Sequence, residues 1–314
     1  MSEEAPATHA GAGQTRDDTP ASKPQLRADP GLWLVATPIG NLEDISQRAL
    51  AVLASVDRVA CEDTRRTGRL LARHGISARL VSYHEHNAAR VRPALLRTLT
   101  GSGSVALVSD AGTPLISDPG YKLVSEAVSA GVRVTGCPGP SAPLLALILS
   151  GLPTDRFYFG GFLPSKAGPR REALATLCSL DATLVFLESP RRLAASLEDM
   201  AATLGPRPAA VARELTKLHE EVRRGPLDEL ASHYAAAGAP KGEVVIVVGG
   251  GRGDTAQPAL SDADIDARLD RLLAGGTVRD AAAALSAETG LPRRALYTRA
   301  LARSRAREGC AVDP

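Results

Sequence analysis

Aromatic side chains are scarce in this sequence, since Phe, Trp and Tyr make up 3% of its 314 residues. A platform that grips single-stranded nucleic acid by stacking on its bases is therefore disfavoured. Cysteine is also rare: Cys61, Cys137, Cys178 and Cys310 lie far apart, without paired spacing. This spacing excludes a zinc ribbon and disfavours a disulfide framework. No H-E-x-x-H motif occurs either, so no metal site is expected.

Long hydrophobic runs are missing too. The longest, residues 142–149, is interrupted by Pro143 and is too short to span a bilayer. The first residues are acidic and polar and lack the pattern of a secretory signal. Because the formal net charge is only +2, just local clusters of charge can indicate a nucleic-acid partner. We expect a cytoplasmic protein without a membrane partner.

Changes of pattern divide the chain, which is longer than one typical domain, into five segments. Residues 1–30 have no apolar period, which predicts a disordered tail. The other predicted segments are an N-terminal α/β domain at 31–150, a second α/β domain at 151–250, a linker at 251–259 and a C-terminal helical domain at 260–314.

Short β-branched runs alternate with helical patterns along both central segments. Strands are predicted at residues 32–36, 58–60, 80–83, 105–109 and 132–135, and again at 157–162, 183–187, 209–212 and 244–248. Helices are predicted at 46–54, 64–74, 89–99, 122–130, 170–180, 191–204 and 227–236. In the N-terminal segment this alternation predicts a mostly parallel sheet with helices on its faces, and the second segment is predicted to be another α/β domain of comparable size.

The C-terminal segment is predicted to be helical from Leu260 to Arg307. Thr277 and Asp280 have the spacing of a capping box. Gly290 and Pro292 fit the stop of one helix and the first turn of the next. Two helices joined by a glycine-containing turn indicate a helix-turn-helix.

Five predicted strand ends carry Gly, Pro, hydroxyl and carboxylate groups, at residues 37–41, 61–65, 82–87, 109–120 and 138–142. Ligands of parallel α/β sheets bind beyond the carboxyl ends of the strands, so we interpret these loops as one ligand-binding rim. The phosphate-binding motifs of NTPases and of dinucleotide-binding domains are absent. The prolines of the rim favour a pocket with fixed walls for a neutral or cationic ligand.

The loops together resemble a known family. The motifs are Thr37-Pro38-Ile39-Gly40-Asn41-Leu42, Glu62-Asp63-Thr64-Arg65, Tyr83-His84-Glu85-His86-Asn87, the loop 109–120, Pro138-Gly139-Pro140-Ser141-Ala142, Gly161-Phe162-Leu163-Pro164, Glu188-Ser189-Pro190 and the run 214–221. They resemble the tetrapyrrole methylase superfamily, in the branch that methylates ribose 2′-oxygens of small-subunit ribosomal RNA. Two departures are Arg191, where His is expected, and Cys61, where a small residue is usual.

The resemblance covers all but the N-terminal tail and implies a class III methyltransferase fold. That fold has two α/β domains with S-adenosylmethionine bound in the cleft between them, and here it carries a small C-terminal helical domain. The resemblance also implies a homodimer. The implied substrate is a cytidine ribose in the decoding region of 16S ribosomal RNA, presented as RNA or as the 30S particle.

The rim is predicted to hold the methyl donor. Asp110 and Asp118 can offset its positive charge, Gly112 and Thr113 can line its adenosine, and Ser141 with the amides of the following helix can bind its carboxylate. A plain N-cap at Ser141 and a plain turn at Asp118 are the alternatives. The predicted donor-site residues are Pro38, Ile39, Gly40, Asp110, Gly112, Thr113, Pro114, Ser117, Asp118, Pro138, Gly139, Ser141 and Ala142.

Methyl transfer to a hydroxyl is an in-line displacement, and the hydroxyl proton needs an acceptor. The candidates are Glu62, Asp63, Lys217 and Glu220, which the sequence does not rank. Asp63 is alternatively the N-cap of the following helix, and Arg65 alternatively pairs with Glu62.

Basic clusters near the second domain's start and at the C-terminus predict contacts with RNA phosphates, although a solvated helix face is the alternative. His84 and His86 alternate at a predicted strand end and are expected to point to opposite sides. The predicted RNA-binding residues are Arg65, His84, Lys166, Arg170, Arg171, Arg293, Arg294 and Arg299.

Two other functions fit the same fold: a methyltransferase acting on a precorrin-like tetrapyrrole, and a non-catalytic ribosome-binding protein. The run 214–221 and the arginine-rich C-terminus favour RNA over a tetrapyrrole. The intact rim from Thr37 to Ala142 favours catalysis over binding alone.

Overall fold

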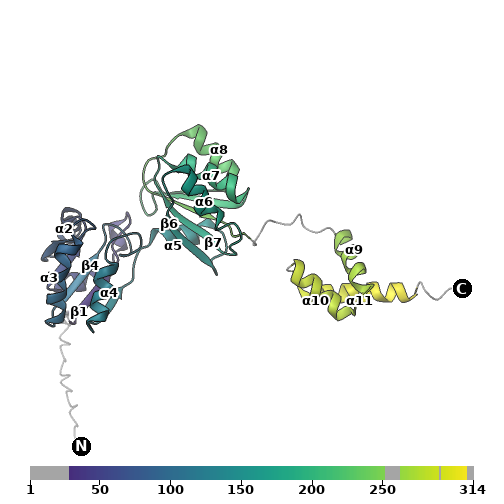
Figure 1. Cartoon of the computed structure of the whole chain (residues 1–314), viewed down its shortest axis with the longest axis horizontal. Coiled ribbons are helices and arrows are strands. Elements are labelled where there is room, and N and C mark those ends of the chain that lie inside the picture. Colours follow the sequence, from purple (N-terminus) through teal and green to yellow (C-terminus); the bar gives the residue numbers. More distant parts are fainter. Residues whose placement is uncertain (1–27, 252–261, 290, 310–314) are drawn as a thin grey trace, which may run out of the picture. The chain divides into compact units, whose positions relative to one another are not determined.

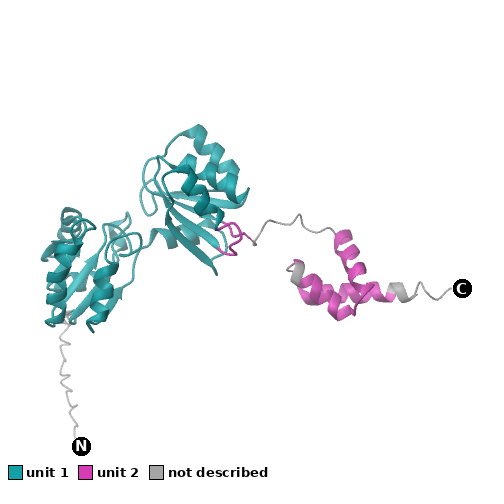
Figure 2. Cartoon of the chain, viewed as in Figure 1, with its two compact units in different colours: residues 1–176, 183–248 teal, residues 177–182, 249–314 magenta. Residues whose placement is uncertain are grey.

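The computed structural model describes residues 28–251, 262–289 and 291–309. It separates into two compact units, one made of residues up to 176 with 183–248, the other of 177–182 with the chain from 249 onward (Figure 2). The predicted tail lies outside the described residues up to position 27, and so does the predicted linker from position 252. No described helix combines the length and apolar character that crossing a membrane requires.

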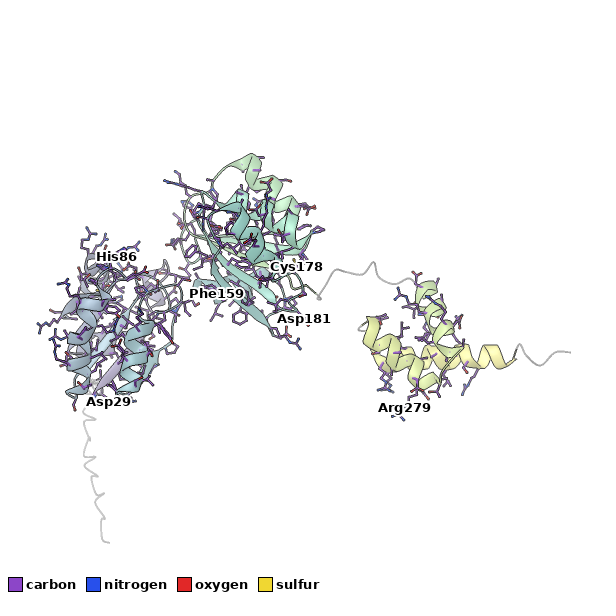
Figure 3. All side chains as sticks on the ribbon, in the orientation of Figure 1. Asp29, His86, Phe159, Cys178, Asp181 and Arg279 are labelled. Carbon is purple, nitrogen blue, oxygen red and sulfur yellow. The ribbon has the colours of Figure 1, made fainter. Side chains whose placement is uncertain are left out.

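The first sheet contains β1 (Gly31–Val35), β2 (Arg58–Cys61), β3 (Leu80–Ser82), β4 (Ser104–Val108) and β5 (Val134–Cys137). Its order is β3-β2-β4-β1-β5, and all its neighbouring strands are parallel (Figure 1). The predicted parallel α/β arrangement is confirmed. Asp29, before β1, and His86, after β3, lie at opposite ends of this part of the molecule (Figure 3). The carboxyl ends of all five strands therefore lie at one edge of the sheet, which is where the predicted rim lies.

Helices cover both faces of this sheet: α1 (Gln47–Ser55), α2 (Thr64–Arg73), α3 (Ala88–Thr100) and α4 (Tyr121–Ser129). Residues of β4 alternate between two hydrophobic clusters, as the two-residue period of a strand requires. Ala106 and Val108 pack with α1 and α2, whereas Val105 and Leu107 pack with α3 and α4. We call this sheet with its four helices the first lobe.

The second sheet contains β6 (Phe157–Phe162), β7 (Thr183–Glu188), β8 (Pro208–Arg213), β9 (Glu221–Pro226) and β10 (Val244–Val248), in the order β6-β7-β10-β8-β9. It is mixed, because β10 runs antiparallel to β7 and β8, and β9 antiparallel to β8. Strand β9 was not predicted, since its sequence Glu-Val-Arg-Arg-Gly-Pro has no apolar alternation. As the partner of β8 at the sheet edge, β9 needs little apolar surface.

Helices α6 (Ala167–Ala175), α7 (Leu193–Leu204) and α8 (Leu227–Ala237) gather over one side of this sheet (Figure 1). Helix α5 (Ala142–Ser150) follows the last strand of the first sheet but packs on the second. Its Ala146 and Leu147 are buried in one cluster with Val185, Ala210 and Val245. We call the second sheet with α5 to α8 the second lobe; both lobes belong to one compact unit.

The C-terminal unit contains α9 (Asp262–Leu273), α10 (Val278–Thr289) and α11 (Arg293–Gly309) around a small core that includes Leu269, Leu285 and Leu296. Thr277 caps α10, as predicted: its Oγ1 accepts the Asp280 N–H at 3.2 Å. The Asp280 carboxylate accepts the Thr277 hydroxyl at 2.7 Å, whereas in a full capping box it would accept the Thr277 N–H. Gly290 lies outside the described residues.

Candidate active site

The loops after β1, β4 and β5 are joined by hydrogen bonds at the carboxyl edge of the first sheet. Thr37 and Gly112 exchange two backbone bonds of 2.9 and 3.0 Å. The Thr37 hydroxyl donates to the Ser109 carbonyl at 3.1 Å, and the Thr113 hydroxyl donates to Pro140 at 3.0 Å. These bonds join the three loops into one surface.

The loop between β4 and α4 contains backbone conformations that are costly for ordinary residues. Leu115 and Ser117 have φ values of 74° and 66°. Gly112 has a φ of 82°. A Cβ at this position would lie only 3.2 Å from Ile39 Cγ2, so a side chain here would press against Ile39. Strained conformations of this kind persist where the surroundings over-determine them, and they cluster at ligand sites.

A cavity of about 430 Å³ opens between the rim and the second lobe. We call it the apolar cavity. It is lined by Ile39, Ala111, Gly112, Thr113, Ile116, Ser117, Asp118, Ser141, Ala142, Pro143, Phe162, Leu187, Glu188, Ser189, Pro190, Gly242, Glu243, Val244 and Val245. Its volume and mostly apolar lining, with a few polar groups, are typical of a small-molecule site.

A second cavity, of about 370 Å³, adjoins the first and shares Ile39, Ala111 and Glu243 with it. We call it the basic cavity. It is lined by Thr37, Pro38, Ile39, Gly40, Leu42, Arg66, Thr67, Arg69, Leu70, Ser109, Asp110, Ala111, Lys217 and Glu243. A third one, the outer cavity, has about 480 Å³ and shares Ser117 and Asp118 with the apolar cavity.

The predicted donor-site residues divide between these cavities. Those lining the apolar cavity are Ile39, Gly112, Thr113, Ser117, Asp118, Ser141 and Ala142. Pro38, Gly40 and Asp110 line the basic cavity. Pro114, Pro138 and Gly139 line none of the three cavities. A Cβ on Gly139 would lie 2.9 Å from that of Ala36, so this glycine permits the close approach of two loops.

Ser141 precedes α5 but makes no capping hydrogen bond through its side chain. Ser141 lines the apolar cavity and directly precedes the first residue of α5. An uncapped helix N-terminus with a hydroxyl beside it presents donors to an anionic group. This geometry favours ligand contact over the plain N-cap.

Three carboxylates, Glu62, Asp110 and Asp118, meet between the ends of β2 and β4. Burial, followed by the charges of Asp118 and Asp110, raises the pKa of Glu62 to about 7. Burial likewise raises the pKa of Asp118, to which the Glu62 acid donates a hydrogen bond. Asp110 accepts the Asp63 N–H at 3.1 Å and pairs with Arg66 at 3.2 Å. Burial and the converging like charges thus both favour the protonated form of Glu62 and Asp118.

Asp63 caps α2, accepting the Arg65 N–H at 2.8 Å. It also accepts from the Arg65 guanidinium, and these bonds lower its pKa to about 2. A carboxylate this acidic is a poor proton acceptor. Arg65 pairs with Asp63 rather than with Glu62, and its side chain is otherwise exposed to solvent.

Lys217 bonds to Glu214 at 2.8 Å and to Glu243 at 3.1 Å. Burial by itself lowers its pKa, but the bonds to the two carboxylates outweigh that effect and raise it. Lys217 therefore stays protonated and is no base at neutral pH. Glu220 accepts the Thr216 N–H at 2.7 Å, and Thr216 Oγ1 accepts the Asn41 N–H at 3.0 Å, so Glu220 supports a contact between the lobes.

His84, a predicted RNA-binding residue, lies beside His86. Strand β3 ends at Ser82, so the alternation expected for His84 and His86 does not extend to them, and their rings meet edge to face with centroids 6.0 Å apart. The expectation that they point to opposite sides is wrong. The Asn87 side chain instead turns the chain by accepting the His84 N–H at 2.9 Å.

Several predicted RNA-binding arginines are engaged in the fold. Arg170 is 4% exposed, and its Nε donates to Asp199 at 2.6 Å. Arg299 bonds to Asp262 and Asp266, which ties α11 to α9. We therefore assign both arginines to internal ion pairs rather than to a free surface. Of the others, Lys166, Arg171, Arg293 and Arg294 are exposed, although Arg171 also bonds to Asp199 at 2.6 Å.

Removing the Asp199 carboxylate should test this assignment. Asp199→Ala leaves the buried Arg170 guanidinium without its anion, so we expect a loss of about 3 kcal/mol in the free energy of unfolding in urea. Glu198→Ala, at the exposed neighbouring position, is the control and should change it by less than about 0.5 kcal/mol. Equal losses for the two variants would contradict a buried ion pair.

Some residues of the site were not predicted as such. Glu188 is buried in the wall of the apolar cavity, where it accepts from Ser189 N at 2.7 Å, Arg192 Nε at 2.8 Å and Ser196 Oγ at 2.5 Å. Its place in a recognised motif was the available signal. Arg66 and Arg69 of the basic cavity were missed as well, although their three-residue spacing on a helix places them on one side.

The fold and the cavity between its lobes agree with a family model. Residues 31–231 match the model of the tetrapyrrole (corrin/porphyrin) methylases, and residues 259–304 match an RsmI C-terminal HTH domain. The chain belongs to the tetrapyrrole methylase family.

Its relatives narrow this class. The chain is 54% identical over 279 residues to ribosomal RNA small subunit methyltransferase I of Mesorhizobium japonicum, covering 88% of this chain and 94% of that protein. It is 47% identical to the protein of the same name from Escherichia coli O157:H7, over 86% and 94% of the two chains. Within the family it therefore falls in the ribosomal RNA small subunit methyltransferase I branch, and it is a methyltransferase.

A solved structure supports the fold. Uroporphyrin-III C-methyltransferase from Thermus thermophilus, complexed with S-adenosylhomocysteine, superposes with a TM-score of 0.50 at 22% identity, covering 70% of this chain and 97% of that one.

Proposed function

We propose that this chain transfers the methyl group of S-adenosylmethionine to the ribose 2′-oxygen of a cytidine in the decoding region of small-subunit ribosomal RNA. The relatives named as ribosomal RNA methyltransferases support an RNA substrate. The observation that carries the proposal is that the apolar cavity and the basic cavity share part of their walls. Asp118 lines the first and Asp110 the second, and both carboxylates interact with Glu62.

The apolar cavity fits the donor. Ile39, Phe162 and Leu187 supply apolar walls for an adenine ring, and Ser141 with the α5 amides supplies donors for a carboxylate. Asp118 supplies a negative charge beside a cationic ligand. S-adenosylmethionine, when bound, supplies a methyl group on a positively charged sulfur. The complex of the Thermus thermophilus protein with S-adenosylhomocysteine supports a donor of this kind.

The Glu62–Asp118 pair is the proposed proton acceptor. As the new C–O bond forms and the S–C bond breaks, the 2′-hydroxyl loses its proton to this pair, and S-adenosylhomocysteine leaves as a neutral thioether. A base is most effective when its pKa lies near the working pH, and Glu62 has a pKa of about 7. Asp63 has a lowered pKa, Lys217 stays protonated, and Glu220 supports a contact between the lobes. These residues are therefore assigned structural or electrostatic roles.

Exposed cations supply the proposed RNA contacts. Lys166 and Arg171 lie at the start of α6, and Arg293 and Arg294 at the start of α11. Arg65 and His84, on the rim, complete the set. Phosphate contacts of this kind are sensitive to salt, so binding is expected to weaken steeply as ionic strength rises.

A homodimer is the proposed assembly. Helix α5 and the edge strand β6 expose large apolar side chains, among them Ile148 at 65% and Phe157 at 44%. Exposed apolar groups in number mark an interaction surface. Ile148→Glu is expected to convert a dimer to a monomer in sedimentation experiments at micromolar concentration. Lys241→Glu, outside α5 and β6, is the control and should leave the dimer intact; a wild-type monomer would contradict the proposal.

Transfer of labelled methyl from S-adenosylmethionine to 30S subunits lacking the modification tests the function, with nucleosides analysed afterwards. Recovery of label as 2′-O-methylcytidine supports it. Transfer to a tetrapyrrole but not to RNA would support the alternative small-molecule function. Donor binding without transfer to either acceptor would favour a non-catalytic ribosome-binding protein.

A further inference from the structure

Three side chains separate the basic cavity from the apolar cavity: Ile39, Ala111 and Glu243. A nucleotide in the basic cavity would therefore lie one layer of side chains from a donor in the apolar cavity. Asp110, which lines the basic cavity, also interacts with Glu62. The basic cavity thus borders both the donor and the carboxylates that the proposed function uses.

The charges of this cavity favour an anionic ligand. Arg66, Arg69 and Lys217 contribute three cations to its wall, against the two carboxylates of Asp110 and Glu243. Lys217 is neutralised by its own acidic partners. The two arginines are therefore the groups available to an incoming phosphate.

Neither arginine is held firmly. Arg66 makes one ion pair, at 3.2 Å to Asp110, and its side chain is 56% exposed. An exposed pair of this kind contributes little, so Arg66 can exchange Asp110 for another anion. Among the described residues Arg69 has no carboxylate partner, and its Nε donates to the Arg65 carbonyl at 3.4 Å. Arginine suits phosphate because its planar group donates two parallel hydrogen bonds.

Helix α2 extends this basic surface beyond the cavity. Its sequence, Thr-Arg-Arg-Thr-Gly-Arg-Leu-Leu-Ala-Arg, contains four arginines and no acidic residue. Arg65, Arg69 and Arg73 follow each other at four-residue spacing, which places them on one side of the helix. The opposite side is anchored in the core by Leu70 and Leu71. Arg65 pairs with Asp63 and Arg73 with Glu43, at 3.1 and 3.2 Å, and both arginines are largely exposed. Exposed pairs contribute little, so both side chains can turn to the phosphates of nucleotides that flank the acceptor.

The outer cavity is the competing position, since it also borders the apolar cavity. Its cations are Arg92 and Lys122, balanced by Glu85 and Asp118. Arg92 is committed to Glu126 at 2.8 Å and is only 17% exposed. The outer cavity therefore offers one available cation.

We propose that the basic cavity receives the acceptor nucleotide and that Arg66 and Arg69 hold RNA phosphates beside the target ribose. This inference rests on the proposed function, because it assigns the substrate site of the same reaction.

The test compares Arg66→Gln, Arg69→Gln and the double variant with Lys122→Gln, which removes the available cation of the outer cavity. Methyl transfer to unmodified 30S subunits gives kcat and KM. Retention of RNA on filters in the presence of S-adenosylhomocysteine gives affinity without turnover. Each arginine variant is expected to raise KM and to weaken RNA binding about tenfold. The dependence of log affinity on log salt should become shallower by about 0.7–0.9 per lost contact.

Two matched readings keep the inference separate from the proposed function. The donor affinity of the arginine variants, measured by calorimetry, should remain that of the wild type, and Lys122→Gln should leave KM within about twofold. Unchanged KM and RNA affinity in the double arginine variant would overturn the inference, and so would a larger effect of Lys122→Gln. Absence of methyl transfer by the wild-type protein would instead contradict the proposed function, while the filter assay would still decide whether the arginines bind RNA.

Discussion

Replacing Glu62 with glutamine is expected to lower kcat for RNA methylation by about 10²–10⁴-fold, the usual contribution of a general base. Glutamine preserves the size of the side chain and its ability to donate a hydrogen bond to Asp118, but it cannot accept a proton. Donor affinity should change little, because Glu62 does not line the apolar cavity. Single-turnover methyl transfer measures the rate, and calorimetry measures the affinity.

The pH dependence gives this prediction a sign. The pKa of Glu62 is raised to about 7, so the wild-type rate should rise as the pH increases through 7 and the side chain loses its proton. Glu62→Gln should lack this rise. The pKa of Glu62 is higher in the folded state than its ordinary value of 4.5, so its contribution to stability is fully present below pH 4.5. That contribution is lost as the pH rises through about 7. Glu62→Gln should therefore melt at a higher temperature than the wild type at pH 8.5, and the difference should shrink toward pH 5.

Glu220→Gln is the matched control, because an amide oxygen can still accept the Thr216 N–H. Its kcat should stay within about threefold of the wild-type value. If Glu62→Gln retained a comparable kcat, the proton would have another acceptor, and the assignment of the Glu62–Asp118 pair would fail.

Filling the apolar cavity should weaken donor binding by roughly one to two orders of magnitude. Ala142 lies in the first turn of α5 and lines this cavity. A tryptophan there occupies the space of the ligand, and overpacking of about 1–3 kcal/mol corresponds to a loss of roughly 5- to 150-fold in affinity for S-adenosylhomocysteine. Calorimetric titration with S-adenosylhomocysteine measures this loss directly.

Ala235→Trp, on the exposed side of α8, controls for the substitution itself and should bind the donor like the wild type. Circular dichroism should show that both variants are folded. Wild-type affinity in Ala142→Trp would mean that the donor binds elsewhere on the chain.

The elements of the first lobe follow closely from its sequence. Runs such as Ser104–Val108 are apolar because helices cover both faces of the sheet, and the loops between them carry Gly, Pro and Asp. Strand β9 was missed because an edge strand next to β8 needs no apolar alternation. Local pattern identifies a buried strand but not one whose pairing is decided by a distant partner.

The rim was predicted from the sequence, but the assignment of its side chains to separate cavities was not. Nothing in the order of residues shows that Pro114 and Pro138 line none of the three cavities while Arg66 and Arg69 line one. Arg170 illustrates the same limit, because the sequence does not show whether an arginine near a motif is exposed to solvent or pairs with the buried Asp199. Partners that come from other elements decide these cases, and only the fold brings them together.

The position of α5 has a practical consequence for dissecting this protein. A fragment that ends at residue 150 would carry Ala146 and Leu147 without the strands that bury them, and a fragment that begins at 151 would leave Val185 and Val245 uncovered. Either fragment would expose an apolar surface and is expected to aggregate when expressed alone. A cut placed before Ser141 would keep the helix with the sheet it covers, at the cost of removing the serine's neighbours from the rim. The boundary that the sequence pattern suggests, between residues 150 and 151, is therefore not one at which the two lobes can be separated as independent modules.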